Sequence, residues 1–236
     1  MQNSGGDSSI IAAAMKTKPF DLVIFDCDGV LVDSEPLANR VFVQIVREHG
    51  YEIDEKTYLK KFSGMILPDR INAIERELNW IAPSNFLEIF NERLAAITER
   101  ELQLVPDIHS LVESLSVPIC IASNGSRKEV AQRLKIAQLT EHFGDAIFSG
   151  LDTPRPKPAP DVYLAAAKAF DISPDRCIVV EDSVPGVTAA VRAGMKVYGH
   201  AAFTPAESLR KAGAIPFGNM LELQTILGDA GNMAAL

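Results

Sequence analysis

Short apolar runs alternate with segments of helical periodicity over the second half of this chain, and one such run lies near its start. The runs that predict buried strands lie at residues 22–25, 118–122, 146–148, 177–180 and 196–198. The segments that predict helices lie at residues 107–115, 127–136, 161–170, 184–193, 205–212 and 221–227. Strands that alternate with helices over short connections are typical of a parallel, doubly wound sheet. We therefore expect an α/β core with 196–198 as its last strand.

The segment between the first two predicted strands has a different pattern, because residues 34–103 are helical in character throughout. Leu37, Val41 and Ile45 recur at helical spacing, and two further helical stretches follow, at residues 70–78 and 86–97. No strand-like run interrupts this segment. It predicts a small helical domain inserted after the first strand.

This change in pattern divides the chain into a core, an inserted helical domain and two flexible ends. The expected bounds are 19–33 and 104–227 for the core, 34–103 for the inserted domain, 1–18 for the leader and 228–236 for the tail. The inserted domain would be joined to the core by hinges near residues 33–34 and 103–104.

The bulk composition restricts the partners and the compartment of the protein. A formal charge of −8 over 236 residues, with no Lys or Arg cluster to offset it, argues against a nucleic acid or a membrane surface as partner. No apolar stretch approaches the length of a membrane span. The cysteines at positions 27, 120 and 177 have neither disulfide nor zinc-site spacing, so we expect packed thiols in a reducing cytoplasm.

Two aspartates follow the first predicted strand directly, in the stretch Phe25-Asp26-Cys27-Asp28-Gly29. Because side chains alternate along a strand, we expect Asp26 and Asp28 to lean to one side and Cys27 to the other. Neighbouring carboxylates repel each other, and a hard divalent cation such as Mg²⁺, which prefers oxygen ligands, would offset the repulsion. The alternative is that one aspartate caps the turn while the other is solvated.

A second polar cluster, Ser123-Asn124-Gly125, follows the predicted strand at 118–122. Ser126 and Glu129 then fit a capping box for the next helix. Free N–H groups at such a helix start, together with the Ser123 hydroxyl, would suit a phosphate group. An ordinary strand-to-helix turn is the alternative interpretation.

A third cluster is the stretch 153–160, in which four prolines flank Lys157. Prolines stiffen the backbone, so they would fix the direction of the ammonium group. A cation held in this way would neutralise charge that develops during the transfer of a phosphoryl group. A solvated surface lysine is the alternative.

The fourth cluster, Glu181-Asp182-Ser183, follows the predicted strand at 177–180. Its two carboxylates would complete an oxygen cage for Mg²⁺ with Asp26. The alternative is that they precede a helix that Ser183 caps, and the two interpretations are compatible.

Common catalytic motifs of other classes are missing from the sequence. No Gly-x-Ser-x-Gly, Walker or Gly-x-Gly-x-x-Gly pattern occurs, which argues against the usual serine hydrolases, P-loop proteins and dinucleotide-binding proteins. The histidines at positions 49, 109, 142 and 200 share no motif or spacing, so we expect surface or satisfied, partly buried side chains.

Taken in order, the four clusters resemble the motifs of the haloacid dehalogenase superfamily: Asp26-x-Asp28-Gly29, Ser123-Asn124, Lys157 and Glu181-Asp182. The resemblance covers about residues 20–227 and implies a Rossmann-like α/β core with the helical segment 34–103 as its cap domain. The Phe-Asp-Cys-Asp-Gly start and the Phe-Ser-Gly segment are similar to one branch of the superfamily. That branch contains β-phosphoglucomutase and bacterial phosphatases of phosphorylated sugars and sugar acids, 6-phosphogluconate phosphatase among them.

The resemblance implies a chemical role for each motif residue. Asp26 would be the nucleophile that takes the phosphoryl group as an aspartyl phosphate. Asp28 would protonate the leaving oxygen and then deprotonate the attacking water. Ser123, backbone N–H groups near Asn124, and Lys157 would bind the phosphoryl oxygens.

The resemblance also implies a metal site and a substrate class. Mg²⁺ would be held by Asp26, the backbone carbonyl of Asp28 and Asp182, with Glu181 binding directly or through water. We therefore expect a cytoplasmic, Mg²⁺-dependent phosphatase that acts on a small phosphorylated metabolite, either a sugar phosphate or a phospho-sugar acid. We expect a monomer or a weak dimer.

Two other functions stay open. The first is a phosphomutase, although that branch typically carries a histidine and a lysine at the positions that hold Ala38 and Ser63 here. The second is a member without catalytic activity that binds a metabolite or a protein, and the intact Asp26 and Asp28 count against it.

Substrate specificity is expected to lie in the cap and at its hinges. The polar residues there that could face the substrate are Glu35, Asn39, Lys60, Lys61, Ser63 and Arg70. Lys60 and Lys61 could attract an acidic sugar, and a solvated charged helix face is the alternative. Closure of the cap would exclude water from the site during the first step.

Overall fold

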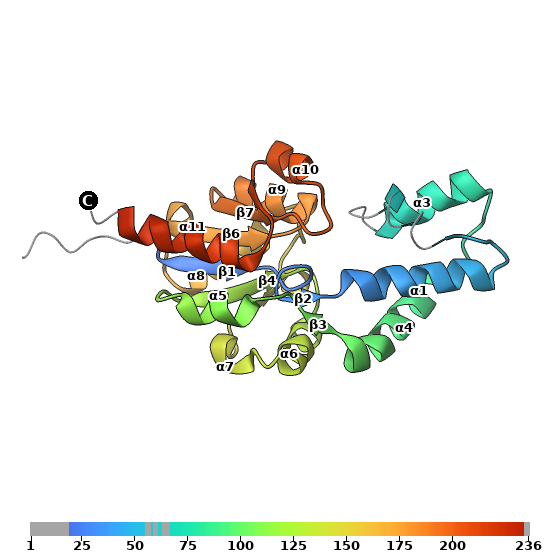
Figure 1. Cartoon of the computed structure of the whole chain (residues 1–236), viewed down its shortest axis with the longest axis horizontal. Coiled ribbons are helices and arrows are strands. Elements are labelled where there is room, and N and C mark those ends of the chain that lie inside the picture. The colour runs from blue at the N-terminus through green and yellow to red at the C-terminus, as the bar shows by residue number, and fades with distance from the viewer. Residues whose placement is uncertain (1–18, 55–57, 59–60, 63–66, 234–236) are drawn as a thin grey trace, which may run out of the picture.

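The computed structural model describes residues 19–54, 58, 61–62 and 67–233, which form an α/β core and a smaller group of helices (Figure 1). The central sheet has the strand order β5-β4-β1-β6-β7-β8, and every pairing in it is parallel. Its strands are β1 (Leu22–Phe25), β4 (Ile119–Ser123), β5 (Ile147–Ser149), β6 (Cys177–Glu181), β7 (Lys196–His200) and β8 (Ile215–Phe217).

Strand β1 lies at the centre of the sheet, since its residues are fully buried and pair with β4 on one side and β6 on the other. Phe25 lies opposite Ile121 of β4 and Val180 of β6. Because parallel strands end at the same edge of a sheet, this register brings the residues that follow β1, β4 and β6 together. The predicted parallel, doubly wound sheet is confirmed.

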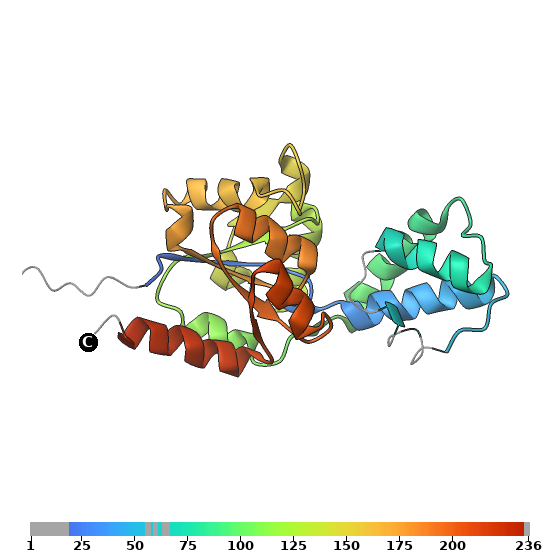
Figure 2. The same cartoon turned by 90° about the horizontal axis from the view of Figure 1, so that it is seen from above.

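Each face of the sheet carries its own group of helices, because side chains alternate along each strand. Val23 and Phe25 face a cluster covered by α5 (Ile108–Ser114), α6 (Arg127–Ile136), α7 (Thr140–Phe143) and α11 (Met220–Met233). Leu22 and Ile24 face a cluster covered by α8 (Asp161–Ala169), α9 (Val184–Arg192) and α10 (Ala206–Ala212). Figure 2 shows the sheet between these two layers. Short 3₁₀ turns occupy Gly150–Asp152 and Pro174–Arg176.

The remaining helices form a separate body at one end of the molecule (Figures 1 and 2). They are α1 (Glu35–Glu48), α3 (Leu67–Leu78) and α4 (Phe86–Glu101). Their apolar side chains form a cluster of their own, in which the Phe42 ring contacts the rings of Tyr58, Phe86 and Phe90. A two-stranded antiparallel ribbon, β2 (Val32–Asp33) with β3 (Gln103–Leu104), connects this body to the core. We propose that this ribbon marks the boundary of the inserted domain.

Three elements differ from the expectation. The strand at 196–198 is not the last, because β8 adds a further edge strand, whose proline and short length hide it in the apolar pattern. The prediction of a flexible tail at 228–236 is wrong for residues 228–233, because these residues belong to helix α11. The four-residue helix α7 lies between the predicted helix at 127–136 and the predicted strand at 146–148, where the sequence analysis assigned no element. The predicted leader, residues 1–18, lies outside the described residues.

The cysteines and the lengths of the helices can be compared with the expectations from composition. Cys27, Cys120 and Cys177 are buried free thiols, as expected for packed cysteines. Within the described ranges, the helices are all too short or too polar to cross a membrane. The cytoplasmic location stays a prediction.

The aromatic cluster of the inserted helices gives a stability prediction. Phe86 is 3% exposed and its ring contacts those of Phe42, Phe90 and Trp80, whereas its neighbour Leu87 is 53% exposed. We expect Phe86→Ala to lower the free energy of unfolding by about 3–5 kcal/mol, because it leaves a cavity. Leu87→Ala, the matched control, should stay within about 0.5 kcal/mol of the wild type. Urea unfolding followed by the fluorescence of Trp80, the single tryptophan, measures both. Equal effects of the two variants would contradict the packing described.

Candidate active site

The polar residues that follow β1, β4 and β6 line one cavity of about 260 Å³. Residues from the inserted helices and from the loop after β7 complete its wall. The residues expected from the sequence that line it are Asp26, Asp28, Ser123, Asn124, Lys157, Glu181, Asp182, Glu35 and Arg70. The structure therefore brings all four motif clusters to one place.

The ammonium group of Lys157 joins two carboxylates at the centre of this cavity. Its Nζ lies 2.6 Å from Asp26 Oδ1 and 2.7 Å from Glu181 Oε1, and its side chain is 4% exposed. Burial alone would lower the pKa of Lys157, but the charges of Asp26 and Glu181 outweigh burial and hold this pKa well above its usual value. The two carboxylates therefore favour the protonated form of Lys157.

The backbone of Lys157 is held by a side chain from the second motif. Asn124 Oδ1 accepts a hydrogen bond from the Lys157 backbone N–H at 2.9 Å, and Asn124 Nδ2 donates one to the Lys157 carbonyl at 3.3 Å. The Lys157–Pro158 peptide bond is cis. Asn124 thus positions the lysine through its side chain, a contact that the sequence did not predict.

Glu181 is the most heavily hydrogen-bonded carboxylate of the site. Its Oε1 accepts from Lys157 and from the Tyr163 hydroxyl, and its Oε2 accepts from the Asp182 and Ser183 N–H groups and the Ser183 hydroxyl. Burial raises the pKa of Glu181, but Lys157 and Ser183 outweigh it, so this pKa lies below its usual value. A Cβ on Gly186 would lie 1.6 Å from Oε1, so only glycine leaves room for this carboxylate.

Asp182 has the opposite character. Among the described residues no group donates a hydrogen bond to its carboxylate, and Lys157 is engaged by Asp26 and Glu181. Burial, with the nearby charge of Glu181, raises the pKa of Asp182 well above its usual value. Gly29, at φ +72°, lets this carboxylate approach the loop after β1, because a Cβ there would lie 2.1 Å from Asp182 Oδ2.

The donor set fits Mg²⁺. Asp26, Glu181 and Asp182 each offer an oxygen, and these oxygens all lie within 4.8 Å of one another. Burial raises the pKa of Asp26 to about 7, against the lowering effect of Lys157. A hard cation favours such oxygen ligands and their ionised forms. Both oxygens of Glu181 accept protein hydrogen bonds, whereas among the described residues Asp26 accepts one at Oδ1 alone and Asp182 accepts none, so Asp26 and Asp182 are the carboxylates available to hold an ion.

The Asp28 carboxylate is held by two residues that the sequence analysis did not identify. Arg133 Nη1 on α6 donates to Asp28 Oδ2 at 2.9 Å, and the Ser34 hydroxyl donates to Asp28 Oδ1 at 2.6 Å. Arg133 lies 105 residues from Asp28 in the chain, so no local pattern could reveal the pair. With its side chain held in this way, Asp28 would reach a metal ion through its backbone carbonyl.

The second motif lies at the start of α6. Ser123 is 3% exposed, and its Oγ accepts a hydrogen bond from the Gly125 N–H at 3.0 Å, which leaves the hydroxyl proton available to a ligand. Ser126 and Glu129 form the predicted capping box. The strand-to-helix interpretation and the ligand interpretation of this motif are therefore compatible.

The residues expected to set specificity fall into three groups. Glu35 and Arg70 form an ion pair on the wall of the cavity, and Arg70 also donates to Asn39 Oδ1 at 2.8 Å. Lys61 pairs with Glu77 on the exposed surface, as the solvated-face alternative implies. Lys60 and Ser63 lie outside the described residues. Phe203 and Thr204, after β7, also line the cavity, and no sequence signal indicated them.

The chain is similar in sequence to a family of hydrolases and to several phosphatases. Residues 20–194 match the family model for haloacid dehalogenase-like hydrolases. The chain is similar to 6-phosphogluconate phosphatase of Escherichia coli K12, with 32% identity over 75% of this chain and 81% of the relative. It is also similar to a phosphorylated carbohydrates phosphatase of Thermotoga maritima, with 27% identity over 89% of this chain and 99% of the relative.

A solved structure agrees with the fold. It is a family hydrolase of Deinococcus radiodurans R1 with bound phosphate and sodium, at a TM-score of 0.78 and 31% identity, covering 91% of this chain and 98% of the other.

The approach of Asp182 to Gly29 gives a prediction for metal binding. We expect Gly29→Ala to weaken Mg²⁺ binding at least tenfold, because its Cβ would displace the Asp182 carboxylate. The matched control is Gly50→Ala, since Gly50 has a similar φ of +86° but open space around it. Both variants should lose about 1–2 kcal/mol of stability from the strained backbone, and only Gly29→Ala should lose Mg²⁺ in calorimetric titration. Wild-type affinity in Gly29→Ala would contradict the assignment of Asp182.

Proposed function

Because the chain belongs to the haloacid dehalogenase-like hydrolases, we propose that it is a Mg²⁺-dependent phosphatase of a phosphorylated sugar or sugar acid. The observation that carries the proposal is the convergence on one cavity of a carboxylate, a buried lysine that it binds, and a second carboxylate to which no group donates a hydrogen bond among the residues that the structure describes. These are Asp26, Lys157 and Asp182. This set supplies a nucleophile, a fixed cation and a metal ligand, which are the groups that phosphoryl transfer needs.

In the first step, a carboxylate oxygen of Asp26 attacks the phosphorus atom and the bond from phosphorus to the sugar oxygen breaks. Asp28 gives its proton to that leaving oxygen, so the sugar departs as a neutral alcohol. Lys157 and the Ser123 hydroxyl bind the phosphoryl oxygens while negative charge is redistributed on them. The product of this step is an aspartyl phosphate on Asp26.

In the second step, Asp28 takes a proton from a water molecule, whose oxygen attacks the phosphorus atom of the aspartyl phosphate. The acyl–phosphate bond breaks, inorganic phosphate leaves and the Asp26 carboxylate is regenerated. When bound, Mg²⁺ would neutralise the carboxylates and the phosphoryl oxygens together. Lys157 cannot provide this alone, since its two strong bonds go to Asp26 and Glu181.

The substrate class rests on the relatives and on the cavity. The E. coli relative is named for 6-phosphogluconate and the T. maritima relative for phosphorylated carbohydrates. In this chain the cavity wall also includes the ion pair of Glu35 and Arg70, whose polar groups suit the hydroxyl or carboxylate groups of a sugar. A monomer or weak dimer in the cytoplasm stays our expectation.

A panel of phosphorylated metabolites tests the proposal. With Mg²⁺, we expect release of inorganic phosphate from sugar phosphates or phospho-sugar acids, and loss of at least 1,000-fold of this activity in Asp26→Asn, because an amide is not a nucleophile here. Asp152→Asn, a change at an exposed aspartate that pairs with Arg127, is the matched control. Isomerisation of sugar phosphates without free phosphate would indicate a phosphomutase instead. Activity retained in Asp26→Asn would exclude Asp26 as the nucleophile.

The contact between Arg133 and Asp28 gives a second kinetic prediction. Arg133→Met removes the partner that orients the Asp28 carboxylate, so we expect kcat to fall about 10–100-fold while KM changes little. Arg127→Met, on the same helix but paired with Asp152 at the surface, should keep both values. Equal kinetics in the two variants, with p-nitrophenyl phosphate as substrate, would show that Arg133 does not position Asp28.

A further inference from the structure

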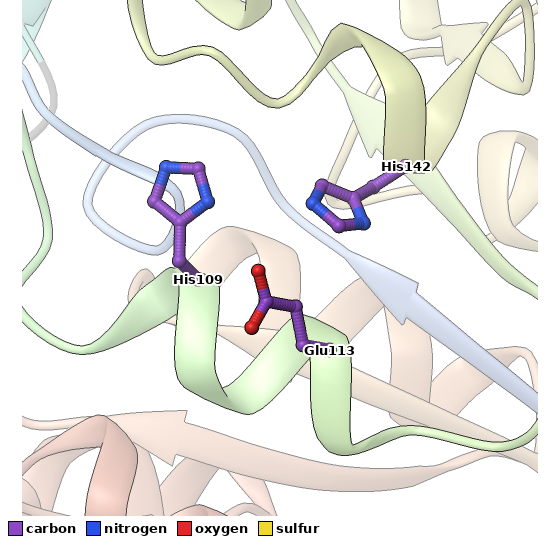
Figure 3. Close-up of side chains that lie close together, drawn as sticks. All are labelled: His109, Glu113 and His142. Atoms are coloured by element: carbon purple, nitrogen blue, oxygen red, sulfur yellow. The ribbon is translucent and has the colours of Figure 1, made fainter.

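A second group of side chains of the types that bind metal ions lies outside the set of residues that line the active-site cavity. It consists of His109 and Glu113 on α5 and His142 on α7. Each residue offers one ligand atom, and these atoms all lie within 4.8 Å of one another. Figure 3 shows the two imidazole rings and the carboxylate turned toward a common space between the helices.

Packing in the core places the helices that carry these side chains, and the rings of His109 and His142 also contact each other. His109 and Glu113 are four residues apart, so they share one face of α5. Helix α5 buries Leu111 in the same apolar cluster that receives Phe143 of α7, whose ring contacts Phe25 of β1 at 5.8 Å. Both helices are therefore fixed on one core, with the His109 and His142 rings 6.1 Å apart at 67°.

A hydrogen bond prepares His109 as a ligand. Its Nε2 lies 3.1 Å from the carbonyl oxygen of Ala137, at the end of α6. A carbonyl oxygen only accepts hydrogen bonds, so Nε2 carries a proton, and in the neutral imidazole Nδ1 then has the lone pair. Metal-binding histidines are commonly oriented in this way, with one nitrogen donating to a carbonyl group and the other facing the ion.

We propose that His109, Glu113 and His142 bind one transition-metal ion of the Zn²⁺ type. Two imidazole nitrogens and one carboxylate oxygen, with water in a fourth position, suit Zn²⁺, whereas Mg²⁺ prefers the all-oxygen set of the active site. Metal–ligand bonds of ~2.0–2.2 Å place ligand atoms roughly 3.3 Å apart. Glu113 and His142 are exposed, so their side chains can turn inward to close the site.

The bound ion would add metal–ligand bonds between α5 and α7, which otherwise meet through the core and the ring contact of His109 with His142. Helix α5 follows β3 of the two-stranded ribbon along the chain, and α7 precedes β5, which is an edge strand of the sheet. A ligand that binds the folded state and not the unfolded chain stabilises the fold by mass action. The ion would therefore link the segment that follows the inserted helices, through α5, to the edge of the sheet, through α7.

Calorimetric titration of Zn²⁺ into the full chain, with saturating Mg²⁺ present to occupy the active site, tests the proposal. We expect one Zn²⁺ per chain in the wild type and a rise in its melting temperature. His142→Ala should weaken Zn²⁺ binding at least tenfold and remove the rise, and Glu113→Gln should weaken binding in the same direction. His49→Ala is the matched control, since His49 is an exposed histidine on the inserted helices.

Two results would overturn the proposal. One is equal Zn²⁺ affinity in the wild type and in His142→Ala, which would place the ion elsewhere. The other is no Zn²⁺ binding by the wild type under these conditions. If His142→Ala is itself less stable without Zn²⁺, the exposed Glu113→Gln variant decides, and unchanged affinity in that variant would exclude the site.

Discussion

The candidate active site depends on the ion pairs that the buried ammonium group of Lys157 forms with Asp26 and Glu181. Moving an ion from water into a protein interior costs several kcal/mol. The charged forms of Asp26, Glu181 and Lys157 are therefore stable there only because they form ion pairs with one another. One lysine cannot balance Asp26, Glu181 and Asp182 together. With all three carboxylates ionised, the site carries excess negative charge, and the Mg²⁺ that we propose would neutralise it and still bind a phosphoryl oxygen.

Close approach between chain segments is what makes this charge arrangement possible. Gly29 and Gly186 leave the space that the carboxylates of Asp182 and Glu181 occupy, and Asn124 holds the backbone that carries the lysine. Three strands thus contribute the site, and the residues that let its parts approach one another follow those strands, with Gly29 and Asn124 in the turns after β1 and β4 and Gly186 in the first turn of α9. Asp28 is held differently, by Arg133 and by Ser34, and because Ser34 directly precedes α1, Asp28 contacts the segment that leads into the inserted helices.

The sequence was sufficient for those parts of the structure that depend on local pattern. Asp26, Ser123 and Glu181 stand at the ends of apolar runs, and parallel strands bring such ends together whatever the details of packing. Contacts between distant segments could not be read in this way. Arg133 is one charged residue among several on α6, and only the folded chain shows that it reaches Asp28. His109 and Glu113 have a legible helical spacing, whereas their pairing with His142 depends on where α7 packs.

The position of β1 has a consequence for the growing chain on the ribosome. This strand is synthesised first, yet its neighbours β4 and β6 are made only after the whole set of inserted helices. Until then its four apolar residues have no sheet to join, while the helices between β2 and β3 can already pack their own aromatic cluster. During that interval the apolar residues of β1 lack their neighbours in the sheet while the inserted helices can already pack together. Such transiently exposed apolar segments are prone to aggregate, so we expect a chaperone to act mainly at this stage.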